Sequence, residues 1–227
     1  EYFLFLIEEL NKEGISGGIF MHKHKMNIYK KDDGKQIIVS GEEEQGSLLS
    51  LSISGNDESI EKNIDDLIFD YLKEDNMSNG YELSNGQTVP ATSRTRLTYC
   101  PDVFVFQVNA FCFNCQMEMT RKKMNPIKFN EIINIFPEND QNPDNSIRYE
   151  IIGVISHCGK SAGSGHYVNY CKDECGIWNA YNDEQGVVKI GKYSKCSKTL
   201  FLGNDELKDH RPYLIFARRL TPSSPLQ

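Results

Sequence analysis

Hydrophobic and polar residues alternate in different ways along the chain, and these patterns predict two helices before residue 73. Residues 2–13 place apolar side chains at helical spacing, which predicts an amphipathic helix that several glycines end. Residues 19–54 change to short strands and turns. Residues 57–72 return to helical spacing, with Asn56 or Asp57 available as the N-cap.

After residue 100 the pattern becomes that of a β-sheet. Apolar alternation predicts strands at 103–113, 147–156, 166–171, 177–181 and 213–219. We therefore predict an α+β protein in which a thin β extension, residues 15–100 with the helix at 57–72, precedes a denser sheet at 101–220. Residues 221–227 are expected to form a solvated tail.

Composition and charge narrow the classes of partner. The 227 residues carry a formal net charge of −7, with 25% charged and 39% hydrophobic residues, an ordinary balance for a globular protein. An acidic chain has no overall electrostatic attraction to nucleic acid or to an anionic membrane surface. The longest apolar run near the start, Tyr2–Ile7, is far shorter than the ~20 residues that span a bilayer. We expect neither nucleic acid nor a membrane as partner, and nothing in the sequence indicates an oligomeric state.

The cysteines indicate a reducing compartment. There are seven, an odd number without a secretory signal, so we expect free thiols and a cytoplasmic or nuclear location. Cys112 and Cys115 have the spacing of a zinc-ligand pair, but Cys112 lies inside a predicted strand and a structural zinc site needs four ligands. Small buried hydrophobic side chains are the favoured interpretation and zinc is the minor alternative, so we predict no metal and no cofactor.

The residues best suited to chemistry lie in a predicted hairpin around a turn at 172–176. If its strands pair evenly about this turn, His166 lies opposite Asn182, at a Cβ separation of ~4.5–5.5 Å. The amide could then hold one imidazole nitrogen and leave the other free to act as a base. A register slip of one residue would bring Asp183 or Tyr181 to the ring instead. A half-buried, purely structural histidine is the alternative interpretation.

A histidine oriented by an amide or a carboxylate forms two-thirds of a nucleophilic triad. The Gly- and Ser-rich residues 159–165 predict a mobile loop that lines a cleft, where the backbone approaches a substrate closely. Other chemistries are not indicated, because the sequence has no phosphate-binding Gly motif with a Lys, no H-E-x-x-H and no G-x-S-x-G.

The same residues carry a family resemblance. Residues 165–168, which read Gly-His-Tyr-Val, followed by Trp178 and by Tyr-Asn-Asp at 181–183, resemble the His box of the ubiquitin-specific proteases, a papain-like family of cysteine deubiquitinases. One departure from the family pattern is Ala110, where Arg is usual. Further segments agree in the same order, so that the resemblance covers residues 1 to about 220: 1–10, 47–54 with 57–72, 99–111, 149–159 and 213–218.

This resemblance implies a fold and a division of the chain. The fold would be the palm–thumb–fingers form of a papain-like cysteine protease, with the thumb largely missing. Residues 1–14 would be a remnant of a thumb helix, 15–100 the fingers and 101–220 the palm. The fingers segments lack the CxxC pairs with which many relatives bind zinc, so fingers without metal are expected.

The resemblance also implies roles for five residues. His166 would be the general base, Asn182 the residue that orients it, and Asp183 an adjacent acidic support. Tyr167 would form a wall beside the ubiquitin tail, and Gly165 would belong to a loop that closes over the C-terminal Gly-Gly of that tail.

The implied activity is hydrolysis of the isopeptide bond after the C-terminal Gly of ubiquitin, so ubiquitin or its conjugates would be the partner. The family's nucleophile is the Cys of a Gly-Asn-x-Cys box, which is expected upstream of residue 1. None of the seven cysteines opens a predicted helix, so we predict that the isolated chain is inactive. The alternative is a catalytically inactive ubiquitin-binding or scaffold domain, which Ala110 favours and the presence of both His166 and Asn182 opposes.

Overall fold

The computed structural model describes residues 2–14, 18–31, 37–55, 57–114, 119–137, 145–161, 164–183, 186–193 and 210–221. These residues form two helices and sixteen strands. In chain order the elements are α1 (Tyr2–Lys12), β1 (His22–Lys30), β2 (Ile37–Gly46), β3 (Leu49–Ser52), β4 (Lys62–Asn63), α2 (Ile64–Leu72), β5 (Asp75–Glu82), β6 (Thr88–Tyr99), β7 (Val103–Asn109), β8 (Phe111–Asn114), β9 (Met119–Lys122), β10 (Ile127–Lys128), β11 (Ile132–Ile135), β12 (Ile147–Ser161), β13 (Ser164–Lys172), β14 (Trp178–Asn182), β15 (Gly186–Gly191) and β16 (His210–Arg219).

Eight strands form the central sheet, in the order β15-β14-β13-β12-β16-β7-β3 with β11 beside β12. Strand β7 shows why this region folds as a core: Phe104, Val105 and Phe106 are all buried, so both faces of the strand are covered. Phe104 and Phe106 belong to the core that includes residues of α2. Val105 lies opposite Phe216, which contacts Phe3 of α1. The two helices thus contribute to the covering of this sheet.

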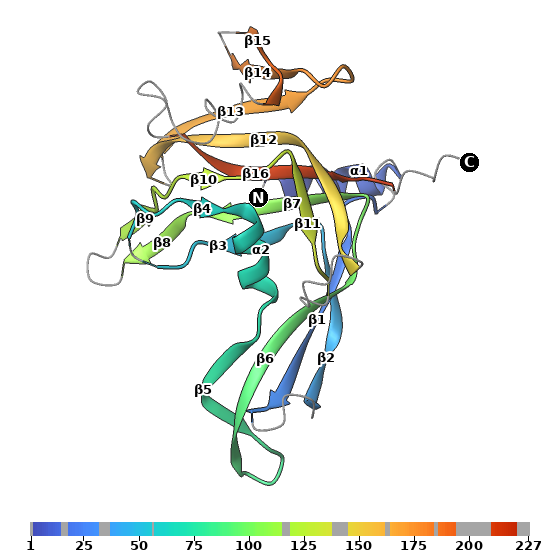
Figure 1. Cartoon of the computed structure of the whole chain (residues 1–227), viewed down its shortest axis with the longest axis vertical. Coiled ribbons are helices and arrows are strands. Elements are labelled where there is room, and N and C mark those ends of the chain that lie inside the picture. Colours follow the sequence, from blue (N-terminus) through green and yellow to red (C-terminus); the bar gives the residue numbers. More distant parts are fainter. Residues whose placement is uncertain are drawn as a thin grey trace.

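Four strands form a second sheet, β2-β1-β6-β5, that extends away from the central sheet as an arm (Figure 1). The arm lies within the extension predicted for residues 15–100. Two parts of that range lie elsewhere, because β3 pairs with β7 in the central sheet and α2 packs into its core. The prediction of one continuous extension is therefore wrong for residues 49–72, and the chain enters the central sheet before it returns to the arm.

The second helix is shorter than the predicted range 57–72, since α2 begins at residue 64. Asn63 is its N-cap, and the side-chain oxygen accepts a hydrogen bond of 3.1 Å from the backbone N–H of Asp65. Asp57 instead accepts hydrogen bonds from the backbone N–H and the hydroxyl of Ser59 in a local turn. The prediction placed the cap at a polar residue that forms a turn ahead of the helix.

The strands predicted after residue 100 are present, with changed limits. The strand predicted at 103–113 is divided at Ala110 into β7 and β8. The strands predicted at 147–156, 166–171, 177–181 and 213–219 correspond to β12, β13, β14 and β16. The possible cap Asn56 and residues 222–227 of the predicted tail lie outside the described residues.

A cluster of charged side chains ties β12 to its neighbours. Lys172 of β13 is only 11% exposed and donates hydrogen bonds to Glu150 of β12 and to Glu131. Glu150 also accepts a hydrogen bond of 2.9 Å from Arg218 of β16. Burial raises the pKa of Glu150, but the hydrogen bonds and charges of the two cations outweigh it and hold that pKa below its usual range. These contacts fix β13 against β12.

Replacing Glu150 with Gln is expected to lower the free energy of unfolding at neutral pH by about 1–2 kcal/mol, because two cations lose a charged acceptor. Since the folded-state pKa of Glu150 is lowered, its contribution is present above the unfolded-state pKa and is lost as the pH falls through the folded-state value. Urea titrations of both proteins at neutral and acidic pH measure this difference. A difference that does not shrink in acid would contradict the ion-pair account.

Candidate active site

The contact expected between His166 and Asn182 is present, although the strand register is not the predicted one. His166 lies near the start of β13 and Asn182 ends β14. The ladder between these strands places Asn169 opposite Tyr181, two residues from the predicted pairing. A shift of two keeps every side chain on the same face of the sheet and leaves diagonal neighbours within reach. His166 Nε2 accordingly lies 2.5 Å from Asn182 Oδ1.

This contact gives the two imidazole nitrogens different states. An amide oxygen can only accept, so the neutral ring carries its proton on Nε2 and keeps a lone pair on Nδ1. Asp183 Oδ2 lies 3.7 Å from Nδ1 of His166, too far for a hydrogen bond, and the Asp183 side chain is 77% exposed. Water screens a carboxylate at that exposure, so Asp183 gives the ring only weak electrostatic support. The His166 side chain is itself 44% exposed, which leaves the ring accessible.

The residue before His166 has no room for a side chain. A Cβ at Gly165 would lie 2.3 Å from Nε2 of His157 and 2.4 Å from the carbonyl oxygen of Cys158. The backbone therefore approaches β12 very closely at this point. The mobile loop predicted at 159–165 is wrong in extent, because every residue of it that the structure describes belongs to β12 or β13. Because Gly165 lacks a side chain, β13 can pack closely against β12 at the residue before His166.

Tyr167 lies between two hollows beside the histidine. Its side chain is half exposed, and its ring contacts the rings of His157 and Tyr213 at centroid distances of 4.9 and 5.7 Å. The larger hollow is a mostly apolar groove of about 920 Å³, and the smaller one has a volume of about 450 Å³. The groove is lined by Phe3, Leu4, Leu48, Gln107, Ile155, Tyr167, Tyr213 and Leu214. The smaller hollow includes Tyr167, Asn169, Tyr181, Asn182 and Asp183.

Two polar groove residues were missed by the sequence analysis. Gln107 of β7 donates a hydrogen bond of 3.0 Å to the hydroxyl of Tyr213 of β16. Their strands are adjacent, and Leu214 lies opposite Gln107 in the ladder. A glutamine inside the apolar run of a strand was a usable signal, because a polar side chain among buried apolar ones usually has a hydrogen-bond partner.

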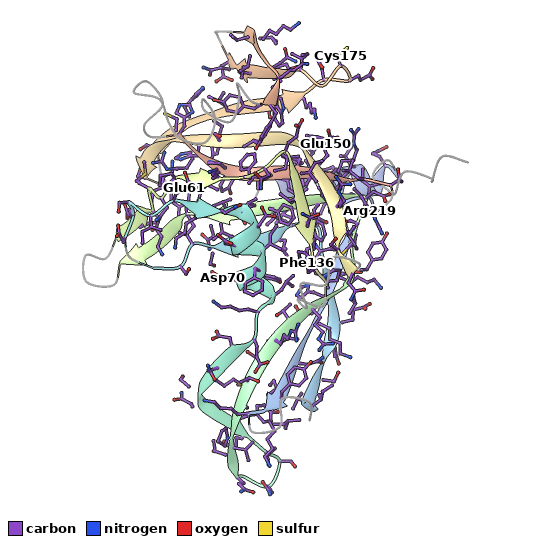
Figure 2. The ribbon with its side chains drawn as sticks, viewed as in Figure 1. Glu61, Asp70, Phe136, Glu150, Cys175 and Arg219 are labelled. Carbon is purple, nitrogen blue, oxygen red and sulfur yellow. The ribbon has the colours of Figure 1, made fainter. Side chains whose placement is uncertain are left out.

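The structure describes the side chains of four cysteines, and none of these four lies at a helix N-terminus. Burial raises the pKa of Cys100 to about 11 and also raises the pKa of Cys171, which disfavours the thiolate at both. Cys158 lies in β12 opposite His166. Cys175 is exposed in the turn between β13 and β14, at the other end of β13 from His166 (Figure 2). That the nucleophile lies outside this chain stays a prediction.

Two further observations concern metals and membranes. Within the described parts of the chain, no group of three or more His, Cys, Asp or Glu side chains could hold a metal ion. Neither helix seen in those parts is long and apolar enough to cross a membrane.

Comparisons with known proteins agree with the fold. Ubiquitin carboxyl-terminal hydrolase 10 of Saccharomyces cerevisiae is 27% identical over 176 residues, which cover 77% of this chain and 20% of that protein. Ubiquitin carboxyl-terminal hydrolase 48 of Rattus norvegicus is 34% identical over 140 residues, covering 60% of this chain and 13% of that protein. The chain therefore spans a small part of the length of these curated relatives.

A solved structure has the same fold. The SAGA Ubp8/Sgf11/Sus1/Sgf73 DUB module bound to ubiquitin aldehyde matches with a TM-score of 0.75 at 19% identity, over 97% of this chain and 48% of the solved chain. The architecture is thus that of a papain-like ubiquitin-specific protease domain. The family model for ubiquitin carboxyl-terminal hydrolases matches residues 1–216. Because this match takes in almost the whole sequence, the chain belongs to the ubiquitin carboxyl-terminal hydrolase family.

Proposed function

We propose that this chain is part of a cysteine-type ubiquitin-specific protease, which hydrolyses the isopeptide bond after the C-terminal Gly of ubiquitin. The observation that carries the proposal is the hydrogen bond between His166 Nε2 and Asn182 Oδ1, in a chain of this family. A single bound nitrogen orients the ring and leaves Nδ1 available as a base. The nucleophilic Cys is proposed to lie upstream of residue 1.

The proposed reaction uses His166 first as a base and then as an acid. Nδ1 takes the proton of the thiol, the sulfur bonds to the carbonyl carbon of the ubiquitin Gly, and the C–N bond breaks as the imidazolium returns the proton to the departing amine. Water then attacks the thioester, with His166 again taking the proton and returning it to the sulfur. Asn182 holds Nε2–H throughout, which keeps Nδ1 directed at the reacting atoms.

The groove beside Tyr167 supports a role in holding the tail of ubiquitin. It is open and mostly apolar, and Gln107 and Tyr213 add polar groups that can bind a peptide backbone. Tyr167 would form one wall, and Gly165, whose backbone packs closely against β12, would belong to the segment beside the tail. Ubiquitin or its conjugates are the proposed partner, and the cytoplasm or nucleus is the proposed location.

The role of His166 can be tested in the full-length protein. His166→Ala is expected to lower kcat for cleavage of a fluorogenic ubiquitin C-terminal amide by about 10³-fold or more, because the thiol loses its base. Ubiquitin binding, measured by calorimetry, should change little. His24→Ala, which alters a histidine on the arm, is the control and should keep the wild-type kcat. Turnover by His166→Ala at the wild-type rate would contradict the role of base, and a wild-type protein that binds ubiquitin without cleaving it would favour an inactive binding domain.

Asn182, the last residue of β14, and Asp183, the next residue, should differ in their effects on kcat. Asn182→Ala is expected to lower kcat by about tenfold to a hundredfold, because the ring loses the bond that fixes its tautomer and orientation. Asp183→Ala should change kcat by less than about threefold, since the carboxylate is exposed and makes no hydrogen bond to the ring. The same fluorogenic assay compares the two variants. The reverse order of effects would show that Asp183, not Asn182, orients the base.

A further inference from the structure

Lys122, at the end of β9, is a buried lysine beside the hairpin that carries His166. Lys122 is only 3% exposed, which is rare for a residue with an ammonium group. Nζ lies 2.8 Å from the carbonyl oxygen of His157, 2.9 Å from that of Gly159 and 3.1 Å from Nδ1 of the His157 ring. These acceptors all belong to residues 157–159 near the end of β12, so one cation holds two backbone carbonyl groups and one imidazole ring of a short segment.

The ammonium also defines the state of the His157 ring. An ammonium group has no lone pair, so Nδ1 of His157 must accept and the neutral ring carries its proton on Nε2. Burial, together with the charges of Lys122 and His210, lowers the pKa of His157, which agrees with a neutral ring. His157 is therefore held in one tautomer and one orientation.

The oriented His157 ring contacts both neighbours of His166. Its Nε2 edge lies so close to Gly165 that a Cβ there would be 2.3 Å away, and its ring packs against Tyr167 with centroids 4.9 Å apart. In the ladder between β12 and β13, His157 lies opposite Tyr167. A displacement of His157 would therefore move the backbone on either side of His166.

We propose that Lys122 is a positioning residue for His166, because its ammonium fixes β12 at residues 157–159 and, through the His157 ring, sets the backbone of Gly165 and Tyr167. The inference rests on the proposed function of His166 as a base. The three Lys122 contacts described above all reach β12, so we expect Lys122 to act on His166 through this strand.

The next residue provides a matched control. Lys123 Nζ donates to the carbonyl oxygens of Ile53 and Gly55, at 2.6 and 3.0 Å, in the segment after β3. It is a lysine with backbone carbonyl acceptors, like Lys122, but it holds a different part of the chain. Lys123→Met therefore removes similar hydrogen bonds without a direct effect on β12 or β13.

The kinetic test compares Lys122→Met with Lys123→Met in the full-length protein. Lys122→Met should lower kcat by about tenfold to a hundredfold with KM nearly unchanged, because a misplaced base slows the chemical step more than it weakens binding of ubiquitin. Lys122→Arg, which keeps donors for the two carbonyl groups, should retain more kcat than Lys122→Met. Equal losses in Lys122→Met and Lys123→Met, or equal losses in Lys122→Met and Lys122→Arg, would overturn the proposal.

A second test needs no activity and separates this inference from the proposed function. In the 227-residue chain, Lys122→Met should shift the backbone amide resonances of residues 165–167 and speed their hydrogen exchange, whereas Lys123→Met should affect residues 53–55. Thermal unfolding of each variant identifies one that fails to fold, in which case Lys122→Arg takes its place. If residues 165–167 respond equally to both lysine variants, the proposal is wrong. If they respond as expected but the full-length wild type cleaves no ubiquitin substrate, the proposed function fails and the positioning contact stands.

Discussion

A histidine base must have one ring nitrogen held and the other left open, and this requirement governs the arrangement around His166. If the second nitrogen were bonded to a group other than the nucleophile, the ring could not take the nucleophile's proton, and if neither nitrogen were held, the ring would rotate and exchange between its two tautomers. The end of β14 supplies one acceptor, Asn182, to Nε2. Asp183 approaches Nδ1 only to 3.7 Å, so it leaves that nitrogen unblocked.

Strand β12 supports the strand that carries His166, and two lysines from other strands bind residues of β12. Toward its start, Lys172 of β13 binds Glu150, and near its end Lys122 of β9 binds His157. Burying an ammonium costs several kcal/mol unless hydrogen bonds and opposite charges compensate for the lost water. Glu150 provides the opposite charge for Lys172, whereas two carbonyl groups and an imidazole nitrogen accept hydrogen bonds from Lys122. Each lysine joins β12 to a second strand, so the hairpin with His166 is fixed at both ends.

The contact at the site could be predicted from the sequence, but the register could not. The prediction centred the turn on residues 172–176, whereas β13 ends at Lys172 and β14 starts at Trp178. Asp173 sets this turn: its side chain accepts from the N–H of Ile177, and its carbonyl accepts from the N–H of Gly176, whose φ is +75°. The contact survived because a shift of two residues preserves the face of the sheet.

Other features depend on residues far apart in sequence. Lys122 and His157 are 35 positions apart, and no local pattern distinguishes Lys122 from Lys123. The start of α2 was missed for a local reason. Asp57 and Asn63 are both residue types that can cap a helix, but Asp57 forms a turn and Asn63 forms the cap. Periodicity therefore located most elements, whereas the tertiary partners of polar side chains had to come from the structure.

The most direct test of this account is the tautomer of His166 in the 227-residue chain, measured by long-range ¹H–¹⁵N correlation spectra of histidine-labelled protein at a pH where the ring is neutral. The account predicts a proton on Nε2 and a free lone pair on Nδ1, with this preference lost in Asn182→Ala. A proton on Nδ1, or a mixture of tautomers that Asn182→Ala leaves unchanged, would show that Asn182 does not prepare His166 as a base.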